Sequence, residues 1–389
     1  KPRIRFKGFT EDWEQRKLGD FTNQINTFVN PEDAKLPLWS LTAEAGLIEK
    51  SDRYERDFLV KKKDQFKRIE TNTLVYNPMN ITIGSIDIYT GLYPIAVSGY
   101  YVSIVYDKNI DTDFLKEVLL LPSSLKMYKN YATGSLIERQ RVQYPTFSKL
   151  QLLLPNLDEQ KAIGQFFKSL NLDITLHQRK LEKLKLAKKA LLQKLFPKNG
   201  SQFPEIRFKG FTDAWEQRKL SDITEIVMGQ SPSSKNYTDN PNDNILVQGN
   251  ADLKDGKVVP RLWTKEITKT IDKDGIILTV RAPVGDVAKT DYKVVLGRGV
   301  AGIKGNDYIY QFLQKLQNNR YWVSLSSGST FESINSNDIK DLIIDIPSIE
   351  EQTKISMLLN NVNSIITLHQ RKLDKLQEVK KGLLQKMFV

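Results

Sequence analysis

Two stretches of the chain carry hydrophobic residues at alternating spacings of three and four, a pattern typical of a coiled coil. The first lies within residues 156–196 and the second within residues 348–389. In each stretch, two companion registers repeat every seven residues and predict a long helix that pairs through one seam. The seam positions of the first stretch are Ile163, Phe167, Leu170, Ile174, His177, Leu181, Leu184, Lys188, Leu191 and Leu195. Those of the second stretch are Ile355, Leu359, Val362, Ile366, His369, Leu373, Leu376, Lys380, Leu383 and Met387.

Capping signals predict where both helices begin. In the first stretch, Asn156 and Glu159 lie at the spacing of an N-cap residue and the third helical residue. In the second stretch, Ser348 and Glu351 have the same spacing, and a proline precedes each pair. The first helix is expected to end at Phe196, before a proline and a glycine, and the second is expected to run to the end of the chain.

The rest of the chain predicts two globular parts, residues 1–155 and 204–347. Short apolar runs rich in β-branched residues, such as 276–280, alternate with Gly, Pro and Asn and predict strands. A helical pattern at 307–322 is interspersed among them. The expected fold class is therefore α+β, with residues 197–203 as a linker between the first helix and the second globular part.

Two segments of the chain, which we call the frame, each occur twice as an internal repeat. Residues 2–20 and 204–222 are identical at 15 of 19 positions, and residues 175–196 and 367–388 are identical at 16 of 22. Each copy therefore has a similar beginning and a similar helix, whereas the sequence between them diverges. This arrangement indicates two modules that bind different ligands within one common architecture.

Faint similarity inside the copies supports a shared scaffold. Gly84 aligns with Gly285 at an offset of 201 residues, and Val97 aligns with Leu296 at an offset of 199. Because the offset falls steadily along the chain, we expect small deletions in the second copy rather than a different fold.

Connectivity favours an antiparallel pair of helices. A helix of about 40 residues is about 60 Å long, whereas the linker 197–203 spans at most about 25 Å. The second globular part must then start at the far end of the first helix and also feed the second helix. The simplest solution is pseudo-twofold, with a globular part at each end. Both histidines, His177 and His369, occupy the same seam position, where a polar residue fixes the register, so metal and catalytic roles are disfavoured.

Composition narrows the classes further. A chain of 389 residues is long for one hydrophobic core, which favours at least two domains. The absence of cysteine excludes disulfides, thiolate metal sites and a thiol nucleophile. No apolar run approaches the ~18 residues of a membrane span and no signal peptide opens the chain, so we expect a cytoplasmic protein without a membrane partner.

The net charge of +12 favours an anionic partner, nucleic acid first. Residues 175–196 carry seven Lys or Arg and one Glu, a net +6, and residues 367–388 carry six and two, a net +4. These two segments together thus account for 10 of the 12 excess charges, which places the excess positive charge on the helices. A solvated basic face, DNA lying across the helices and a docked partner protein all remain open as explanations. Globular parts near neutrality should bind DNA weakly alone, because phosphate contacts supply most non-specific affinity, and this indicates that partner subunits complete the DNA-binding surface.

Two motifs resemble catalytic signatures without completing them. GRGVAG at 297–302 matches the dinucleotide-binding fingerprint, but neither the required helix nor an acidic residue about 20 positions on follows it. Its glycines are better explained by a tight turn that presents Arg298. NPMN at 77–80 lacks the second proline and the aromatic residue of the adenine methyltransferase motif. We assign no catalytic residue and expect a chain that is not an enzyme.

Several runs together with the repeated frames resemble the specificity subunit of type I restriction–modification enzymes over essentially the whole chain. The similarity is specific, because the motifs occur in order and the frames occur twice. The runs that carry it are RFKGFT and WEQRKL in both openings, GQSPSS at 229–234, VQGNADL at 247–253, LTVRAPVGDV at 278–287, LGRGVAGI at 296–303, GSTFESINSNDI at 328–339 and IPSIEEQ before the second helix.

The resemblance implies a division of labour. Residues 1–155 and 204–347 would be target-recognition domains, each reading one half of a bipartite site in double-stranded DNA. Helices 156–196 and 348–389 would set the spacer and dock two modification subunits. Those subunits would carry S-adenosylmethionine, and restriction subunits would use ATP and Mg, so this chain would need no cofactor and no metal. The first copy has SGYY at 98–101 where the second has GRGV, so the half-sites are expected to differ.

Long side chains with paired hydrogen-bonding groups are the candidates for base contacts. Arg281 and Arg298 suit guanine, and Gln230 and Gln248 suit adenine. The counterparts in the first copy, by position or chemistry, are Asn77, Asn80, Tyr100, Arg139 and Arg141. An alternative for the arginines is an ion pair with a nearby carboxylate such as Asp286.

Two other classes of protein remain open. A stand-alone, two-headed DNA-binding regulator would need more basic surface in its globular parts than this chain has. A coiled-coil scaffold without a DNA role would not require two divergent globular parts on a copied frame. A gel shift with and without a methyltransferase partner would distinguish all three.

Overall fold

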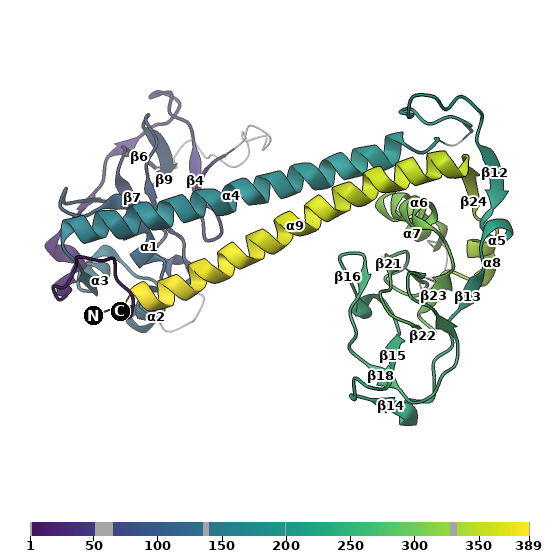
Figure 1. Cartoon of the computed structure of the whole chain (residues 1–389). Helices are drawn as coiled ribbons and strands as arrows, with labels where there is room; N and C mark the ends of the chain where they lie inside the picture. Colours follow the sequence, from purple (N-terminus) through teal and green to yellow (C-terminus); the bar gives the residue numbers. More distant parts are fainter. Residues whose placement is uncertain (1, 51–64, 135–139, 199, 327–332, 389) are drawn as a thin grey trace. The chain divides into compact units, whose positions relative to one another are not determined.

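The computed structural model describes residues 2–50, 65–134, 140–198, 200–326 and 333–388 (Figure 1). Two compact units divide the chain. Unit 1 is Lys1–His177 with Lys372–Val389, and unit 2 is Gln178–Arg371. The division cuts both long helices, α4 (Leu157–Lys194) and α9 (Ile349–Met387). Each unit therefore holds the beginning of one long helix and the end of the other.

Unit 1 is built on a four-stranded antiparallel sheet in the order β2-β10-β7-β8, beside the smaller sheets β3-β6-β9, β4-β5 and β1-β11. Its strands are β1 (Glu14–Lys17), β2 (Thr22–Ile25), β3 (Phe28–Val29), β4 (Trp39–Thr42), β5 (Gly46–Glu49), β6 (Phe66–Ile69), β7 (Thr73–Tyr76), β8 (Ile86–Tyr89), β9 (Ile95–Ser98), β10 (Val102–Tyr106) and β11 (Gln151–Leu154). Its short helices are η1 (Leu18–Asp20), η2 (Ile81–Ile83), α1 (Thr112–Leu119), α2 (Pro122–Tyr131) and α3 (Tyr144–Phe147).

Unit 2 has a six-stranded sheet in the order β13-β23-β20-β21-β17-β16 and a five-stranded sheet in the order β14-β18-β15-β22-β19, with β12 paired to β24. Its strands are β12 (Glu216–Lys219), β13 (Ile226–Met228), β14 (Tyr237–Thr238), β15 (Asn244–Val247), β16 (Leu253–Lys254), β17 (Lys257–Val258), β18 (Trp263–Thr264), β19 (Thr270–Ile271), β20 (Ile276–Thr279), β21 (Val287–Lys289), β22 (Val294–Leu296), β23 (Val300–Ile303) and β24 (Ile343–Ile346). Its short helices are α5 (Leu220–Ile223), η4 (Ser234–Asn236), η5 (Asn250–Asp252), α6 (Asp307–Asn318), α7 (Tyr321–Ser326) and α8 (Ser336–Lys340). The predicted α+β class is confirmed.

The predicted N-caps start both long helices. The side-chain oxygen of Asn156 accepts a hydrogen bond from the backbone N–H of Glu159 at 2.9 Å. Ser348 Oγ accepts from the N–H of Glu351 at 3.4 Å. These bonds satisfy backbone donors that the first helical turn leaves free, which explains why both helices begin directly after these residues.

The two long helices run antiparallel within unit 1. The ring of Phe167 on α4 lies 5.8 Å from that of Phe388, just after α9. Further along α4, Asn171 donates to Glu117 of α1 at 2.6 Å, and the same Glu117 carboxylate pairs with Lys380 at 3.2 Å. Advancing along α4 thus corresponds to moving back along α9.

Unit 2 repeats this arrangement with the helices exchanged. Phe196, just after α4, packs against Tyr308 of α6 with ring centroids 5.2 Å apart. Further back on α4, Lys188 donates to Gln314 of α6 at 2.9 Å, and Gln311 of the same helix donates to Asn360 of α9 at 2.8 Å. The end of one long helix and the start of the other therefore complete the core of each unit.

The predicted seam positions are all buried or half-buried. Leu181 and Leu373 are buried, whereas Leu184, Leu376 and both histidines are half-buried. Many hydrophobic residues outside the registers are exposed, such as Leu172, Leu186 and Leu368, whereas Leu192 is buried in the core of unit 2. The residue-by-residue pairing across the seam stays a prediction.

The interiors of the two copies share a scaffold, as the drifting offset predicts. Strand β10 lies between β2 and β7, and β23 lies between β13 and β20 in the same way. Gly84 and Gly285 both adopt the left-handed backbone region, with φ of 98° and 89°, before the equivalent strands β8 and β21. At Gly285, a Cβ would also lie only 2.8 Å from the indole of Trp322, so glycine is required there.

Candidate nucleic-acid interface

Antiparallel pairing brings three loops of unit 2 to one edge of its six-stranded sheet. Thr279, the last residue of β20, is paired with Val300, the first residue of β23. Arg281 follows the first strand and Arg298 precedes the second, so both leave the sheet at the same edge. Strand β13 ends at this edge too, because it pairs antiparallel with β23, and Gln230 follows it directly.

Gln248 reaches the same edge from the five-stranded sheet. It follows β15, which runs parallel to β22 with Val247 opposite Leu296. Backbone hydrogen bonds tie the loops after these strands together: Gly297 donates to the Val247 carbonyl at 2.7 Å, and Gln230 donates to the Leu296 carbonyl at 2.8 Å. The structure thus gathers Gln230, Gln248, Arg281 and Arg298, which we call the second edge cluster.

Glycines allow these loops to approach so closely. A Cβ on Gly229 would lie 2.0 Å from the carbonyl oxygen of Gly297, and a Cβ on Gly299 would lie 2.1 Å from that of Gln248. Both clashes are with backbone, which has no rotamer to change. The glycines of the GRGVAG run therefore serve loop packing, and strand β23 follows them where a dinucleotide site would need a helix.

The polar side chains of the second edge cluster are accessible. Gln230, Arg281 and Arg298 are exposed, and Gln248 is half-buried, with its amide nitrogen 2.6 Å from the hydroxyl of Tyr237. Neither guanidinium hydrogen-bonds to, or pairs with, any of the residues described here. The alternative of an ion pair with Asp286 is thus not observed.

Unit 1 gathers its predicted residues at the corresponding edge. Tyr76, the last residue of β7, pairs with Val102, the first of β10, so Asn77 and Tyr100 leave the sheet together. The Arg141 guanidinium lies 5.7 Å from the centre of the Tyr100 ring, within cation–π range.

Asn80 follows on the same loop, and its N–H donates to the Asn77 carbonyl at 3.1 Å. Tyr100, Arg141 and Asn80 are exposed, and Asn77 is half-buried. We call Asn77, Asn80, Tyr100 and Arg141 the first edge cluster. Arg139, also predicted for this site, lies outside the described residues.

Comparison with known proteins places the chain in a family. A family model described as the type I restriction modification DNA specificity domain matches residues 10–186 and again residues 212–378. The chain belongs to the family of type I restriction–modification specificity subunits. The resemblance inferred from the repeated frames is confirmed, and the two matches coincide with the two copies.

Relatives of this family span nearly the whole chain. A protein of Methanocaldococcus jannaschii assigned as the type I restriction enzyme MjaX specificity subunit is 26% identical over 395 residues, which cover 96% of this chain and 92% of the relative. The MjaVIII specificity subunit of the same organism is 22% identical over 400 residues, with 96% and 91% covered.

Solved structures of the family share the fold. The crystal structure of the type I restriction-modification system S subunit from M. genitalium matches with a TM-score of 0.68 at 13% identity and covers 100% of this chain and 99% of that one. A chain from a structural study of complex assembly and conformational transition of the type I R-M system matches with a TM-score of 0.56 at 19% identity, with 97% of each chain covered.

The sequence did not reveal the residues that support the edge clusters. Lys67, 4% exposed, donates to the Tyr101 carbonyl at 2.7 Å behind the first cluster, and its burial lowers its pKa. Asp252, 5% exposed, accepts from the N–H groups of Gln248 and Gly249 at 2.7 and 3.2 Å. No quoted run includes Lys67, and Asp252 lies within VQGNADL without having been singled out. The burial of their charges, which is rare in proteins, is the feature that distinguishes them in the structure.

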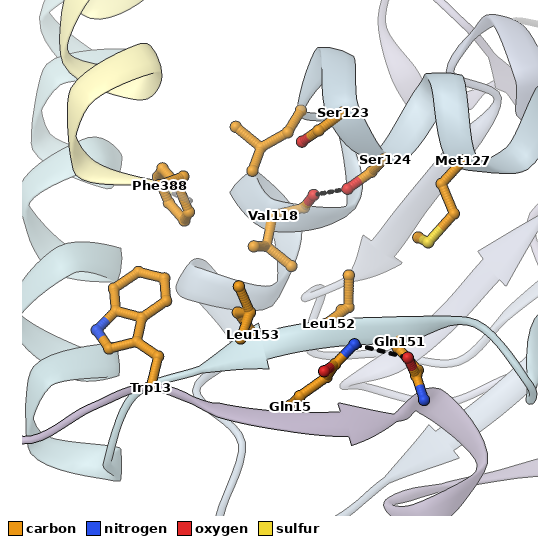
Figure 2. Close-up of a pocket in the computed structure, with 11 residues that line it drawn as sticks. Trp13, Gln15, Val118, Ser123, Ser124, Met127, Gln151, Leu152, Leu153 and Phe388 are labelled. Carbon is orange, nitrogen blue, oxygen red and sulfur yellow. Dashed lines mark hydrogen bonds between the residues drawn. The ribbon is translucent and has the colours of Figure 1, made fainter. Parts of the chain in front are cut away.

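A cavity of about 180 Å³ in unit 1 lies beside the frame strands (Figure 2). Its walls are mainly apolar and include Trp13, Met127 and Phe388, with the hydrogen-bonded pair Gln15 and Gln151 at one side. None of the residues predicted to contact bases lines it.

Among the residues that the structure describes, none of the helices combines the length and apolar character needed to cross a membrane.

Proposed function

We propose that each unit of this specificity subunit reads one half of a bipartite DNA site through its edge cluster. One observation carries the proposal: divergent loops from two copies of one scaffold meet at equivalent sheet edges and expose their polar side chains there. A shared scaffold explains the common geometry, and the divergent loops supply different hydrogen-bonding groups. The two half-sites should therefore differ in sequence.

The chemistry of the clusters suits base edges in the major groove. In the second cluster, the exposed guanidinium groups of Arg281 and Arg298 can each donate two hydrogen bonds to guanine O6 and N7, and Gln248 can pair with adenine N6 and N7. The first cluster offers the amides of Asn77 and Asn80, which suit adenine, with Arg141 as its described cation. We infer a guanine-containing half-site for unit 2 and an adenine-richer one for unit 1.

We further propose that α4 and α9 set the distance between the half-sites and dock two modification subunits. The 10 excess positive charges of residues 175–196 and 367–388, which lie almost entirely within these helices, supply either phosphate contacts or a surface for an acidic partner. The chain itself would be non-catalytic. Modification subunits would bring S-adenosylmethionine, restriction subunits would bring ATP and Mg, and the assembly would act on DNA in the cytoplasm.

The direct test is methylation of a random DNA library by the full chain together with its modification subunits. We expect an enriched motif of two specified halves around an unspecified spacer. The same chain without partners should bind this DNA weakly in a gel shift and should show no saturable binding of S-adenosylmethionine. A single continuous motif would contradict two readers, and tight sequence-specific binding by the chain alone would favour a stand-alone regulator.

Helix length offers a separate test of the spacer role. One heptad inserted after Lys183 and another after Lys375 would keep the seam in register. Seven residues lengthen each helix by about 10 Å, which corresponds to about three base pairs of extra spacer at ~3.4 Å each. The preferred spacer is measured with a library of all spacer lengths. Retained activity at the original spacer would refute the role of the helices as a ruler.

A further inference from the structure

Asp286 connects three separate elements behind the second edge cluster. It lies at the end of the loop between β20 and β21, five residues after Arg281. Its carboxylate accepts a hydrogen bond from the side-chain amide of Asn250, at the start of η5, and another from Gln317 of α6 at 2.7 Å. Its own N–H donates to Thr279 Oγ1, at the end of β20, at 2.9 Å.

The loop that carries Arg281 is already fixed on one side. Thr279 Oγ1 donates to the carbonyl of Pro283 at 2.9 Å, and Gly285 packs tightly against the indole of Trp322. The loop that carries Gln248 is fixed separately by the carboxylate of Asp252. Apart from the backbone bonds that both loops make to the loop at 297–299, these contacts do not join the two loops directly.

The bond between Asn250 and Asp286 spans this gap. Asn250 lies two residues after Gln248, in the same loop. Its hydrogen bond to Asp286 therefore links the loop of Gln248 to the loop of Arg281. Hydrogen bonds to a carboxylate are stronger than those between neutral groups. Asp286 is half-buried and Asn250 is exposed, so the bond between them lies at the surface of the junction. Gln317 holds the other oxygen and anchors the junction to α6.

We propose that Asp286 is a positioning residue that sets base preference at the second half-site by fixing Gln248 relative to Arg281. The inference rests on the proposed function, in which this edge reads DNA. Bidentate contacts discriminate between bases best when the side chains that make them, here Gln248 and Arg281, are held in place before DNA binds. Both carboxylate oxygens already accept hydrogen bonds from the protein, and a negative charge at a phosphate-binding edge disfavours direct contact with DNA. Both facts favour a role through the neighbouring loops.

The test uses the full chain with its modification subunits and a random DNA library, and it compares four variants with the wild type. Asp286→Ala removes the junction, and Asn250→Ala removes only the arm to the Gln248 loop. Asp286→Asn keeps the shape and can restore both bonds, because an amide accepts at its oxygen and donates at its nitrogen once a partner amide is reversed. Asp291→Ala is the matched control, since Asp291 pairs with Lys257 at the surface beyond the opposite end of β21.

We expect Asp286→Ala and Asn250→Ala to lower discrimination at the second half-site by about tenfold, within the range that one bidentate contact contributes. Base preference at the first half-site and non-specific affinity should stay unchanged in both variants. Asp286→Asn should retain most of the discrimination, and Asp291→Ala should retain all of it. A purely structural role would lower folding stability or overall affinity without changing the ratio between bases at one half-site.

Three outcomes would overturn the inference. Unchanged base preference in folded Asp286→Ala and Asn250→Ala, with a normal wild type, would show that the junction does not position the readers. A reversed preference in Asp286→Asn would show that Asp286 reads a base directly. A wild type that enriches no bipartite motif would overturn the proposed function itself, and the inference with it.

Discussion

Unit 1 and unit 2 use the same residues where their long helices begin and different residues where their sheets end. Arg5 forms a bidentate pair with Glu159 at 2.7 and 2.6 Å, and Arg207 forms the same pair with Glu351 at 2.8 Å through both nitrogens. Both glutamates are 1% exposed. A buried carboxylate tolerates no loss of its partner, whereas an exposed loop tolerates many side chains. The contrast fits a frame that is largely identical in the two copies and edges that differ.

A second contrast lies on the seam itself. Lys380 of α9 pairs with the carboxylate of Glu117 in unit 1, whereas the equivalent Lys188 of α4 donates to the neutral amide of Gln314 in unit 2 and pairs with no carboxylate among the residues that the structure describes. Burial without a counter-ion lowers the pKa of Lys188 to about 8. The same seam position thus carries a compensated charge in one unit and an uncompensated charge in the other.

The frame pairs should give the largest effect on stability. Arg207→Ala leaves Glu351 buried without its partner and should cost about 3–5 kcal/mol of unfolding free energy. Arg5→Ala should cost less, because Trp13 Nε1 also donates to Glu159 at 3.2 Å, whereas the indole nitrogen of Trp215 has no partner among the described residues. Urea unfolding measures both.

Lys209→Ala and Lys7→Ala, exposed neighbours of these arginines in each copy, are the matched controls and should change stability little. Equal losses for the two arginine variants would show that the tryptophan bond contributes nothing and that the two frames are energetically the same.

Removing one candidate base-contacting arginine from each unit should affect one half-site at a time. Arg281→Ala should lose about 1–3 kcal/mol of base discrimination in one half-site, and Arg141→Ala a similar or smaller amount in the other. Sequencing of methylated library DNA gives both values in one experiment. The control Lys293→Ala, a surface lysine paired with Asp272, should leave base preference unchanged. Loss in both half-sites from one variant would break the assignment of one reader to each unit.

The pH dependence of stability should reveal the uncompensated lysine. Because the folded-state pKa of Lys188 lies near 8 and its ordinary value is 10.5, the unfolded chain binds more protons between these values. The unfolding free energy contributed by this group should therefore rise between pH 8 and about 10.5, by about 1–3 kcal/mol. The measurement is the difference between wild type and Lys188→Met across this range.

Gln314→Glu would give unit 2 the carboxylate that Glu117 supplies in unit 1. It should raise the pKa of Lys188 and remove most of the rise with pH. A rise that persists in this variant, or one that is absent from the wild type, would contradict the assignment of the effect to Lys188.

The smallest effect is expected behind the first edge cluster. Lys67→Met keeps the length of the side chain but removes its bond to the Tyr101 carbonyl, and should change stability by about 1 kcal/mol or less. Base preference at the first half-site should still weaken, because Tyr100 lies next to the released carbonyl. Library sequencing is again the measurement, and a change confined to the second half-site would refute this placement.

The sequence predicted the frame better than the clusters because the frame depends on local and repeated signals. The heptads and caps located both helix starts, and the glycine pair Gly84 and Gly285 showed the shared scaffold. The first helix ends at Lys194, slightly before the predicted Phe196, and the next two residues, Leu195 and Phe196, are buried in the core of unit 2. The helical pattern at 307–322 divides into α6 and α7.

The edge clusters depend on contacts between distant positions in the divergent interiors. Family motifs brought Arg281 and Arg298 to attention, and strand pairing showed that they are neighbours. The bond between Asn250 and Asp286 joins residues 36 positions apart, and that between Lys67 and Tyr101 joins residues 34 apart. Neither pair has a spacing rule, so only the folded chain could reveal them.

The glycines at 229, 297 and 299 have a consequence for how new specificities can arise. At 229 and 299 the backbone contacts admit no side chain, and at 297 a Cβ would lie 3.0 Å from Gln248 Cα, while the neighbouring Gln230 and Arg298 are exposed. Exchange of the exposed residues alters the chemistry offered to a base without rerouting the chain. A library that randomises those positions and keeps the glycines should therefore contain mostly folded proteins. Natural variation can change specificity in the same way, by single substitutions at these positions.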